Sequence, residues 1–231
     1  MKRFKVFVID IDGTICDYNG LLNLEAVHSI KWLRKMGYEV MLASGRGPWD
    51  AYYLGIFIGT TNATVCENGG VLMTSPSDFK LFADKRESLE AYDLLSKSLP
   101  DVKVKPVSAR LTEIVLLRTF DPAEGQKVLD RAFIPVTIND SQFSLHLTKK
   151  GVTKALALKE AFKILNIKPE EAVAIGDSLT DISMLDYCGY GIAVGNASGE
   201  VKSHSDYVCK EQIGDGVVEA INHVTQGEIG R

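Results

Sequence analysis

Three aspartates stand directly after apolar stretches that are typical of buried strands. Asp10 and Asp12 follow the stretch 4–9, and Asp177 follows the stretch 172–175. Open α/β sheets bind ligands at the carboxyl ends of their strands, and residues two apart on an extended segment face the same way. Carboxylates that share a small volume repel each other unless a cation or a shared proton relieves them. These side chains therefore predict a divalent-cation site, and hard oxygen ligands around an open site favour Mg²⁺.

A Mg²⁺ site of this kind suits a phosphate ester, because Mg²⁺ commonly bridges protein carboxylates to a substrate phosphate. Ser44 and the amide of Gly45 follow another apolar stretch and can donate hydrogen bonds to phosphoryl oxygens. Lys149, Lys150 and Lys154 are candidates for the positive charge that phosphoryl transfer needs, and Lys154 is favoured because it lies inside a predicted helix. Each residue alone has an ordinary explanation as a helix cap, a turn or a solvated lysine. Their common position near strand ends favours a phosphoryl-transfer site.

The elements that must position these residues alternate between strand and helix. Asn23 is a predicted N-cap, Gly37 a predicted C-terminal stop, and Pro48 suits the first turn of the next helix. Such alternation predicts an α/β fold with a Rossmann-like, doubly wound parallel sheet. The predicted strands span 4–9, 38–43, 63–66, 172–175, 191–194 and 207–209, and predicted helices of the second half span 152–165 and 217–224.

The alternation changes after about residue 80, where the pattern predicts a small inserted α+β unit. Its helices are expected at 86–99 and from Asp121-Pro122 onward, and its strands at 113–117, 136–138 and 143–147. We therefore expect residues 1–82 and 151–231 to form the core, and residues 83–150 to form a cap.

The composition excludes several classes of protein. The chain has 231 residues, 45% of them hydrophobic and 24% charged, as in soluble globular proteins. A formal net charge of -4 gives no basic surface for nucleic acid or an anionic membrane, so neither partner is expected. The first apolar stretch ends at Asp10, too early for a secretory signal or a membrane span, so a cytoplasmic location is expected. Four cysteines without a CxxC pair are expected to be buried thiols: Cys16, Cys66, Cys188 and Cys209.

Four ordered segments resemble the motifs of the haloacid dehalogenase (HAD) superfamily of phosphohydrolases. They are Asp10-Ile11-Asp12-Gly13-Thr14, Ser44-Gly45-Arg46, Lys154, and Gly176-Asp177-Ser178-Leu179-Thr180-Asp181. The predicted cap falls between the second and third motifs, which is its place in the Cof-type (subclass IIB) branch. Its small size makes the chain most similar to the archaeal-type phosphoglycolate phosphatases.

The resemblance implies a covalent mechanism for a phosphomonoester hydrolase. Asp10 would attack phosphorus and become an aspartyl phosphate. Asp12 would protonate the departing alkoxide and then take a proton from the hydrolytic water. Ser44 and Lys154 would hold the phosphoryl group, and the substrate would be a small phosphorylated metabolite such as 2-phosphoglycolate.

The resemblance also implies the metal ligands. The Asp10 carboxylate, the Asp12 backbone carbonyl and Asp177 would hold Mg²⁺, with Asp181 as a further ligand or an anchor. One position departs from the usual pattern, because Thr180 stands where these relatives usually carry Asn. The contacts around the phosphate are therefore expected to differ in detail.

Further residues are candidates for binding the substrate. Asn68, in Glu67-Asn68-Gly69-Gly70, matches a segment whose Asn side chain can reach the active site, although an Asn-Gly turn is an equally good explanation. Arg110, Arg118 and His146 are the cap residues that could pair with a carboxylate of the leaving group. No spacing distinguishes one of these three from the others.

Several alternatives stay open at this point. A sugar-phosphate phosphatase or a phosphomutase of the same superfamily would share every motif. A receiver-like signalling domain also forms an aspartyl phosphate, but it has no use for a general acid two residues beyond the nucleophile. An idle sugar-phosphate-binding protein would keep the fold without turnover. A homodimer is compatible with the sequence.

Overall fold

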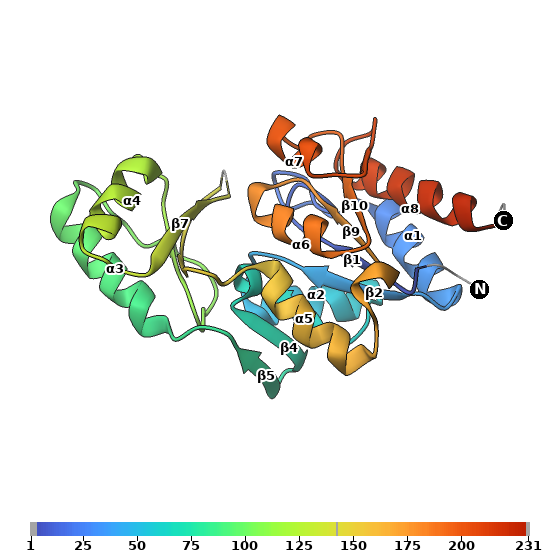
Figure 1. The fold of residues 1–231 in the computed structure, drawn as a ribbon, viewed down its shortest axis with the longest axis horizontal. Helices are drawn as coiled ribbons and strands as arrows, with labels where there is room; N and C mark the ends of the chain where they lie inside the picture. Colours follow the sequence, from blue (N-terminus) through green and yellow to red (C-terminus); the bar gives the residue numbers. More distant parts are fainter. Residues whose placement is uncertain (1–3, 142, 230–231) are drawn as a thin grey trace.

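An eight-stranded sheet and the helices that flank it form the larger part of the protein (Figure 1). The computed structural model describes residues 4–141 and 143–229. In spatial order the strands are β11 (Tyr207–Val208), β10 (Tyr190–Ala193), β9 (Ala172–Gly176), β1 (Val6–Ile9), β2 (Glu39–Ala43), β3 (Thr64–Cys66), β4 (Val71–Ser75) and β5 (Asp78–Leu81). The strands from β11 to β3 pair in parallel, whereas β4 and β5 pair antiparallel. The predicted doubly wound α/β fold is confirmed, with an antiparallel extension at one edge.

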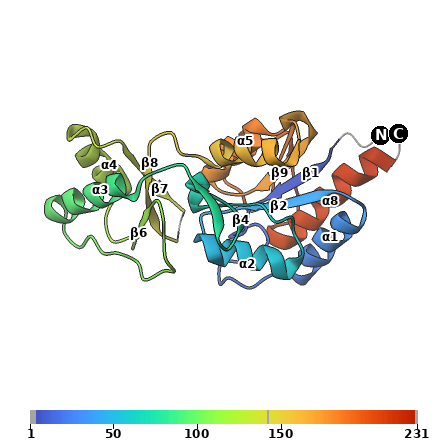
Figure 2. The same cartoon turned by 90° about the horizontal axis from the view of Figure 1, so that it is seen from below.

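Helices cover both faces of this sheet (Figure 2). Because successive residues of a strand point to opposite faces, Phe7 and Ile9 of β1 pack on one side, and Val6 and Val8 pack on the other. The first side is covered by α1 (Leu24–Lys35), α2 (Pro48–Ile58) and α8 (Ile213–Ile229), and the second by α5 (Lys154–Leu165), α6 (Ile182–Tyr187) and α7 (Gly199–Ser203). Strand β1 is therefore buried on both faces and gives Asp10, at its end, a rigid support.

The chain between β5 and α5 forms a second, three-stranded antiparallel sheet. Its strands lie in the order β6 (Ile114–Leu116), β8 (Leu145–Lys149) and β7 (Val136–Asp140). Two helices, α3 (Lys85–Ser98) and α4 (Pro122–Arg131), pack on one face and enclose an apolar core with Leu145 and Leu147. The other face is turned toward the eight-stranded sheet (Figure 1). We call this unit the cap; its predicted limits at residues 83 and 150 stay predictions.

Several predicted elements differ from those in the structure. The strand predicted at 143–147 is β8, which lies two residues further along. The last helix, predicted at 217–224, begins at Ile213. The prediction began it too late because Gly214 and Gly216 lower the helix propensity of its first turn. The prediction omitted β4, β5, α6 and α7, which are short or lie at an edge.

The described residues also bear on the expectations about thiols and membranes. All four cysteines are free and buried, as expected. Within residues 4–141 and 143–229, no helix is both long and apolar enough to cross a membrane.

Candidate active site

The carboxyl ends of four neighbouring strands meet at one cavity of about 610 Å³. Asp10 follows β1, Asp177 follows β9, Ser44 follows β2, and Asn68 lies just past β3. All four line the cavity, and residues of the cap line its other side. The structure therefore brings together residues that are far apart in the sequence, at the edge of the sheet where ligands of open α/β folds bind.

Lys154 lies fully buried between two carboxylates of this site. It is the first residue of α5, which begins after the N-cap Thr153. Its Nζ lies 2.6 Å from Asp10 Oδ1 and 2.5 Å from Asp181 Oδ1. Burial acts to lower the pKa of the Lys154 ammonium, but Asp10 and Asp181 outweigh burial and raise it. Lys154 is therefore a fixed positive charge beside Asp10.

The other two candidate lysines point elsewhere. Lys149 Nζ lies 2.7 Å from Glu87, and Lys150 Nζ lies 2.8 Å from Asp130. Both pairs are partly exposed, and both lysines bind acidic residues outside the site. Of the three lysines, Lys154 is the one placed beside Asp10.

Three carboxylates gather near the ends of β1 and β9: Asp10 and Asp177 line the cavity, whereas Asp181 is fully buried and does not. One oxygen from each of Asp10, Asp177 and Asp181 lies within 4.8 Å of the other two. Burial raises the pKa of Asp10 well above its ordinary value, the charge of Asp181 raises it further, and Lys154 opposes both. Burial and the charge of Asp181 also raise the pKa of Asp177 to about 7. A divalent cation would relieve this repulsion, so the set of oxygen donors fits Mg²⁺.

Asp177 is held close to the first motif. Its Oδ1 accepts a hydrogen bond from Thr14 Oγ1 at 2.8 Å. Gly13 has a φ of 89°, and a Cβ at that position would lie 2.3 Å from Asp177 Oδ2. A side chain larger than hydrogen at Gly13 would therefore push Asp177 away from Asp10.

Asp181 is an anchor rather than an open ligand, because both of its oxygens already have partners. Oδ1 contacts Lys154, and Oδ2 accepts hydrogen bonds from the backbone N–H of Asp177 at 3.1 Å and of Ser178 at 2.9 Å. The Ser178 hydroxyl also donates to Oδ2, at 2.9 Å. Of the two roles that the sequence left open for Asp181, this geometry supports the anchoring one.

Asp12 forms an ion pair that was not predicted from the sequence. Arg46 Nη2 lies 2.5 Å from Asp12 Oδ1, and Arg46 Nε lies 2.9 Å from Asp12 Oδ2. Hydrogen bonding to Asp12 raises the pKa of the Arg46 guanidinium further above its ordinary value. A bidentate pair of this kind fixes the orientation of the carboxylate at the rim of the cavity.

The loop after β2 and the turn after β3 pack against each other. Ser44 is buried, and its Oγ accepts a hydrogen bond from the backbone N–H of Arg46 at 3.0 Å. The Asn68 backbone N–H donates to the Ser44 carbonyl at 3.1 Å. Asn68 itself is buried with a φ of 53°, and its Nδ2 has no partner among the described residues. Asn68 thus offers an uncommitted donor at the cavity.

Thr180, the departure from the usual fourth motif, also lines the cavity. Its Oγ1 lies 2.8 Å from Ser178 Oγ, the hydroxyl that donates to the anchoring carboxylate of Asp181. Thr180 therefore supports the fourth motif through a hydroxyl contact.

Glu67 connects the core to the cap, a role that was not predicted from the sequence. Its buried carboxylate accepts hydrogen bonds from the backbone N–H groups of Leu111 and Thr112, both at 2.7 Å, and from Thr112 Oγ1 at 2.5 Å. Burial raises the pKa of Glu67, and the nearby charge of Glu113 raises it further. The only sequence signal for this residue is its position beside Asn68, in a glycine-rich turn.

The three cap candidates separate into two groups. Arg110 and His146 are largely buried and line the cavity. Arg118 pairs with Asp140 at 2.8 Å, has a side chain that is 48% exposed, and does not line the cavity. The structure therefore leaves Arg110 and His146 as the candidates that face a leaving group.

We expect the stability of the metal-free protein to depend on pH. Because the pKa of Asp177 is about 7 in the folded chain and about 3.9 in an unfolded one, the folded state binds more protons between these values. The free energy of unfolding should therefore fall as the pH rises through about 7. At about pH 8, saturating Mg²⁺ should raise the melting temperature over that in EDTA by roughly 5–10 °C. This increment should be smaller at about pH 5.5, where Mg²⁺ must displace protons.

Thermal unfolding at both pH values, with Mg²⁺ or EDTA, measures these increments. The matched variant is Asp177→Asn, in which the Mg²⁺ increment should largely disappear. An equal or larger Mg²⁺ increment at the lower pH would contradict the assignment of the carboxylate cluster as the metal site.

Comparison with known families gives a match over most of the chain. A family described as haloacid dehalogenase-like hydrolase matches residues 7–105 and 114–221. A phosphoglycolate phosphatase of Nitrosopumilus maritimus is 36% identical over 223 residues, which are 96% of each chain. A phosphoglycolate phosphatase of Archaeoglobus fulgidus is 35% identical over 222 residues, covering 96% of this chain and 97% of that one.

Solved structures share the fold over nearly the whole chain. A crystal structure of a Thermoplasma acidophilum protein matches with a TM-score of 0.86 and 25% identity, over 96% of this chain and 98% of that one. A sugar phosphatase of HAD subclass IIB matches with a TM-score of 0.79 and 22% identity, over 96% of this chain and 99% of that one. The likeness to the sugar phosphatase shows a shared fold.

Proposed function

The chain belongs to the haloacid dehalogenase-like hydrolase family and is a phosphatase, and from this premise we propose that it hydrolyses 2-phosphoglycolate to glycolate and phosphate. The observation that carries the proposal is the placement of buried Asp10 beside the fixed charge of Lys154, at a cavity that the cap residue Arg110 also lines. The archaeal relatives named phosphoglycolate phosphatase align over nearly the full chain and support this substrate.

We assign the nucleophile to Asp10. Lys154 holds Oδ1 of its carboxylate, which leaves Oδ2 to attack phosphorus. A bond forms between this oxygen and phosphorus while the ester bond from phosphorus to the leaving oxygen breaks. Asp12 gives its proton to the leaving oxygen, so that glycolate departs as a neutral alcohol at that oxygen.

The second half of the reaction releases phosphate. Asp12, now a carboxylate, takes a proton from a water molecule that attacks phosphorus in the aspartyl phosphate. The bond between phosphorus and Asp10 breaks, and the Asp10 carboxylate is restored. Arg46 can hold Asp12 in the carboxylate form that acts as the base, because its guanidinium spans both carboxylate oxygens. For the first transfer, one of these oxygens must carry the proton instead of pairing with Arg46.

The phosphoryl group needs donors that match its developing negative charge. We assign Ser44, the Gly45 amide and Lys154 to this role. Buried donors that are fixed before the reaction stabilise charge without having to reorient.

We further propose that Mg²⁺ is held by the carboxylates of Asp10 and Asp177 and by the backbone carbonyl of Asp12, with Asp181 anchoring the loop. When bound, the ion offsets the negative charge of nucleophile and substrate, which would otherwise repel each other. The close approach of the carboxylates of Asp10 and Asp177, and the raised pKa of each, support this ligand set.

A sugar-phosphate phosphatase is the second candidate, and the size of the cavity favours it. About 610 Å³ is more than a two-carbon leaving group fills, and cavities of this size hold larger ligands. The likeness to a sugar phosphatase shows the shared fold alone. The substrate must therefore be decided by assay.

The test is phosphate release from a panel of esters in Mg²⁺ and in EDTA. The panel contains 2-phosphoglycolate, phosphoglycerate, sugar phosphates and a nitrophenyl ester. We expect 2-phosphoglycolate to be hydrolysed with a kcat/KM at least about tenfold above that for every sugar phosphate, and EDTA to abolish turnover. A higher kcat/KM for a sugar phosphate than for 2-phosphoglycolate would show that the sugar phosphate is the substrate. Transfer of phosphate back to a second position of the sugar would indicate the phosphomutase alternative.

A further inference from the structure

One face of the cap sheet is polar and yet buried. Along β8, Leu145 and Leu147 pack against the cap helices, so His146 and Thr148 point to the opposite face. Both are almost completely buried, as is Ser144 just before the strand. A solvated sheet face would be exposed, so these polar groups require partners between the cap and the core.

A chain of hydrogen bonds runs across this face. His146 Nε2 lies 3.2 Å from Ser144 Oγ, and His146 Nδ1 lies 3.0 Å from both oxygens of Glu113. Glu113 Oε1 also accepts a hydrogen bond from Arg110 Nη1 at 2.7 Å. The same Arg110 Nη1 donates to the Gly45 carbonyl of the core at 2.5 Å. The network therefore ends on the loop that carries Ser44.

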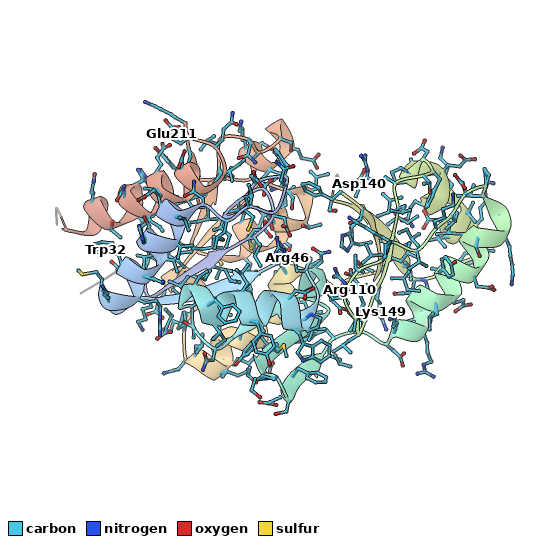
Figure 3. All side chains as sticks on the ribbon, turned by 180° about the vertical axis from the view of Figure 1, so that it is seen from behind. Trp32, Arg46, Arg110, Asp140, Lys149 and Glu211 are labelled. Carbon is cyan, nitrogen blue, oxygen red and sulfur yellow. The ribbon has the colours of Figure 1, made fainter. Side chains whose placement is uncertain are left out.

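Two buried donors beside this loop have no partner among the described residues. One is Arg110 Nε, on a side chain that is 10% exposed, and the other is Asn68 Nδ2. Both side chains lie beside Gly45: Arg110 Nη1 donates to its carbonyl, and a Cβ at Gly45 would lie 3.0 Å from Asn68 Oδ1 and 3.2 Å from Asn68 Nδ2. Figure 3 shows Arg110 between the core and the cap, close to Arg46, and both residues line the cavity. Leaving such donors unsatisfied costs free energy, more so when one is charged.

We propose that Arg110 and Asn68 form a subsite for the carboxylate of the leaving alcohol. This proposal rests on the proposed function and names the chemical class of the leaving group: a 2-hydroxy acid. The two hydrogen bonds recorded for the guanidinium both use Nη1, so the edge that carries Nε is uncommitted. The planar edge of an arginine matches a carboxylate in two parallel hydrogen bonds.

The position of the subsite suits a short leaving group. In 2-phosphoglycolate a single methylene separates the ester oxygen from the carboxylate, so the carboxylate must bind next to the phosphoryl group. Gly45 follows Ser44 directly, and the side chains of Arg110 and Asn68 both lie against it. Because Arg110 belongs to the cap and Asn68 to the core, the subsite is complete only when cap and core meet.

The test compares two substrates that differ in the carboxylate. Ethyl phosphate carries a methyl group where 2-phosphoglycolate carries the carboxylate. We expect Arg110→Met to lower kcat/KM for 2-phosphoglycolate by about 100-fold, chiefly through KM, and to change that for ethyl phosphate by less than about threefold. The inhibition constant for glycolate should rise in parallel. Arg118→Met removes a cap arginine outside the cavity and should leave kcat/KM for both substrates unchanged.

The outcomes separate this inference from the proposed function. If the wild type releases phosphate from neither ester nor from the panel, the proposed function fails. If Arg110→Met lowers kcat/KM equally for both esters, the guanidinium serves the phosphoryl group or the fold. The proposed carboxylate subsite is then wrong, and the proposed phosphatase activity is unaffected. If Arg110→Met does not fold, the same comparison of kcat/KM for the two esters is made with Asn68→Gly and with the wild type. Glycine suits the left-handed backbone at position 68. A wild-type preference for 2-phosphoglycolate over ethyl phosphate that is less than about threefold overturns the subsite.

Discussion

The Asp10→Asn protein is expected to release phosphate at less than about one ten-thousandth of the wild-type rate, because an amide cannot form the aspartyl phosphate. The fold should survive the change. Burial already raises the pKa of Asp10 well above its ordinary value, so the site accepts a neutral side chain of the same shape. Lys154 keeps its second carboxylate partner, Asp181. Phosphate release and thermal unfolding, measured on the same preparation, test both parts.

Mass spectrometry after an acid quench adds a direct readout of the intermediate. The wild type, mixed with 2-phosphoglycolate, should carry one added phosphoryl group on Asp10, and the variant should carry none. The matched control is Asp186→Asn, which removes an exposed carboxylate that pairs with His204. Turnover by Asp10→Asn above about one per cent of wild type would show that another residue is the nucleophile.

Replacing Lys154 by Met should cost both stability and activity. The change leaves Asp10 and Asp181 buried without the ammonium that lies between them. Removing one partner of a buried ion pair typically costs about 3–5 kcal/mol, so the melting temperature should fall by roughly 10 °C. Phosphate release should fall by about 10²–10³-fold, since the fixed positive charge beside the nucleophile is lost.

Two comparisons distinguish this effect from a general loss of packing. Lys150→Met removes a partly exposed pair with Asp130 and should change the stability by less than about 1 kcal/mol. The destabilisation of Lys154→Met should shrink in acid, because protonation of Asp10, whose pKa burial raises, removes its repulsion with Asp181. A melting temperature close to that of wild type at neutral pH would contradict the central role of this lysine in the carboxylate cluster.

The sequence predicted the parallel sheet because its buried strands are short apolar stretches that end at polar residues. Each of Asp10, Ser44 and Asp177 follows such a stretch, and the parallel order of strands brings them to one edge. The polar and apolar residues of 143–148 alternate clearly, but alternation alone does not define where a strand ends, so β8 was placed two residues early. The antiparallel strands β4 and β5 lie outside the alternation of strand and helix and were missed.

Contacts that depend on docking of the cap could not be predicted in the same way. Arg110 meets Gly45 across 65 residues of sequence, and Glu67 meets Thr112 across 45. Such pairs follow from how two separately packed units fit together, which no local spacing records. The ion pair of Arg46 with Asp12 depends on side-chain conformation and was missed for the same reason.

The hydrogen bonds of Glu67 make the contact between core and cap a buried polar one. If Leu111 and Thr112 move away, a carboxylate that had three donors needs water in their place. Separation of the two units would therefore require hydration of this single buried carboxylate, at the turn that also carries Asn68.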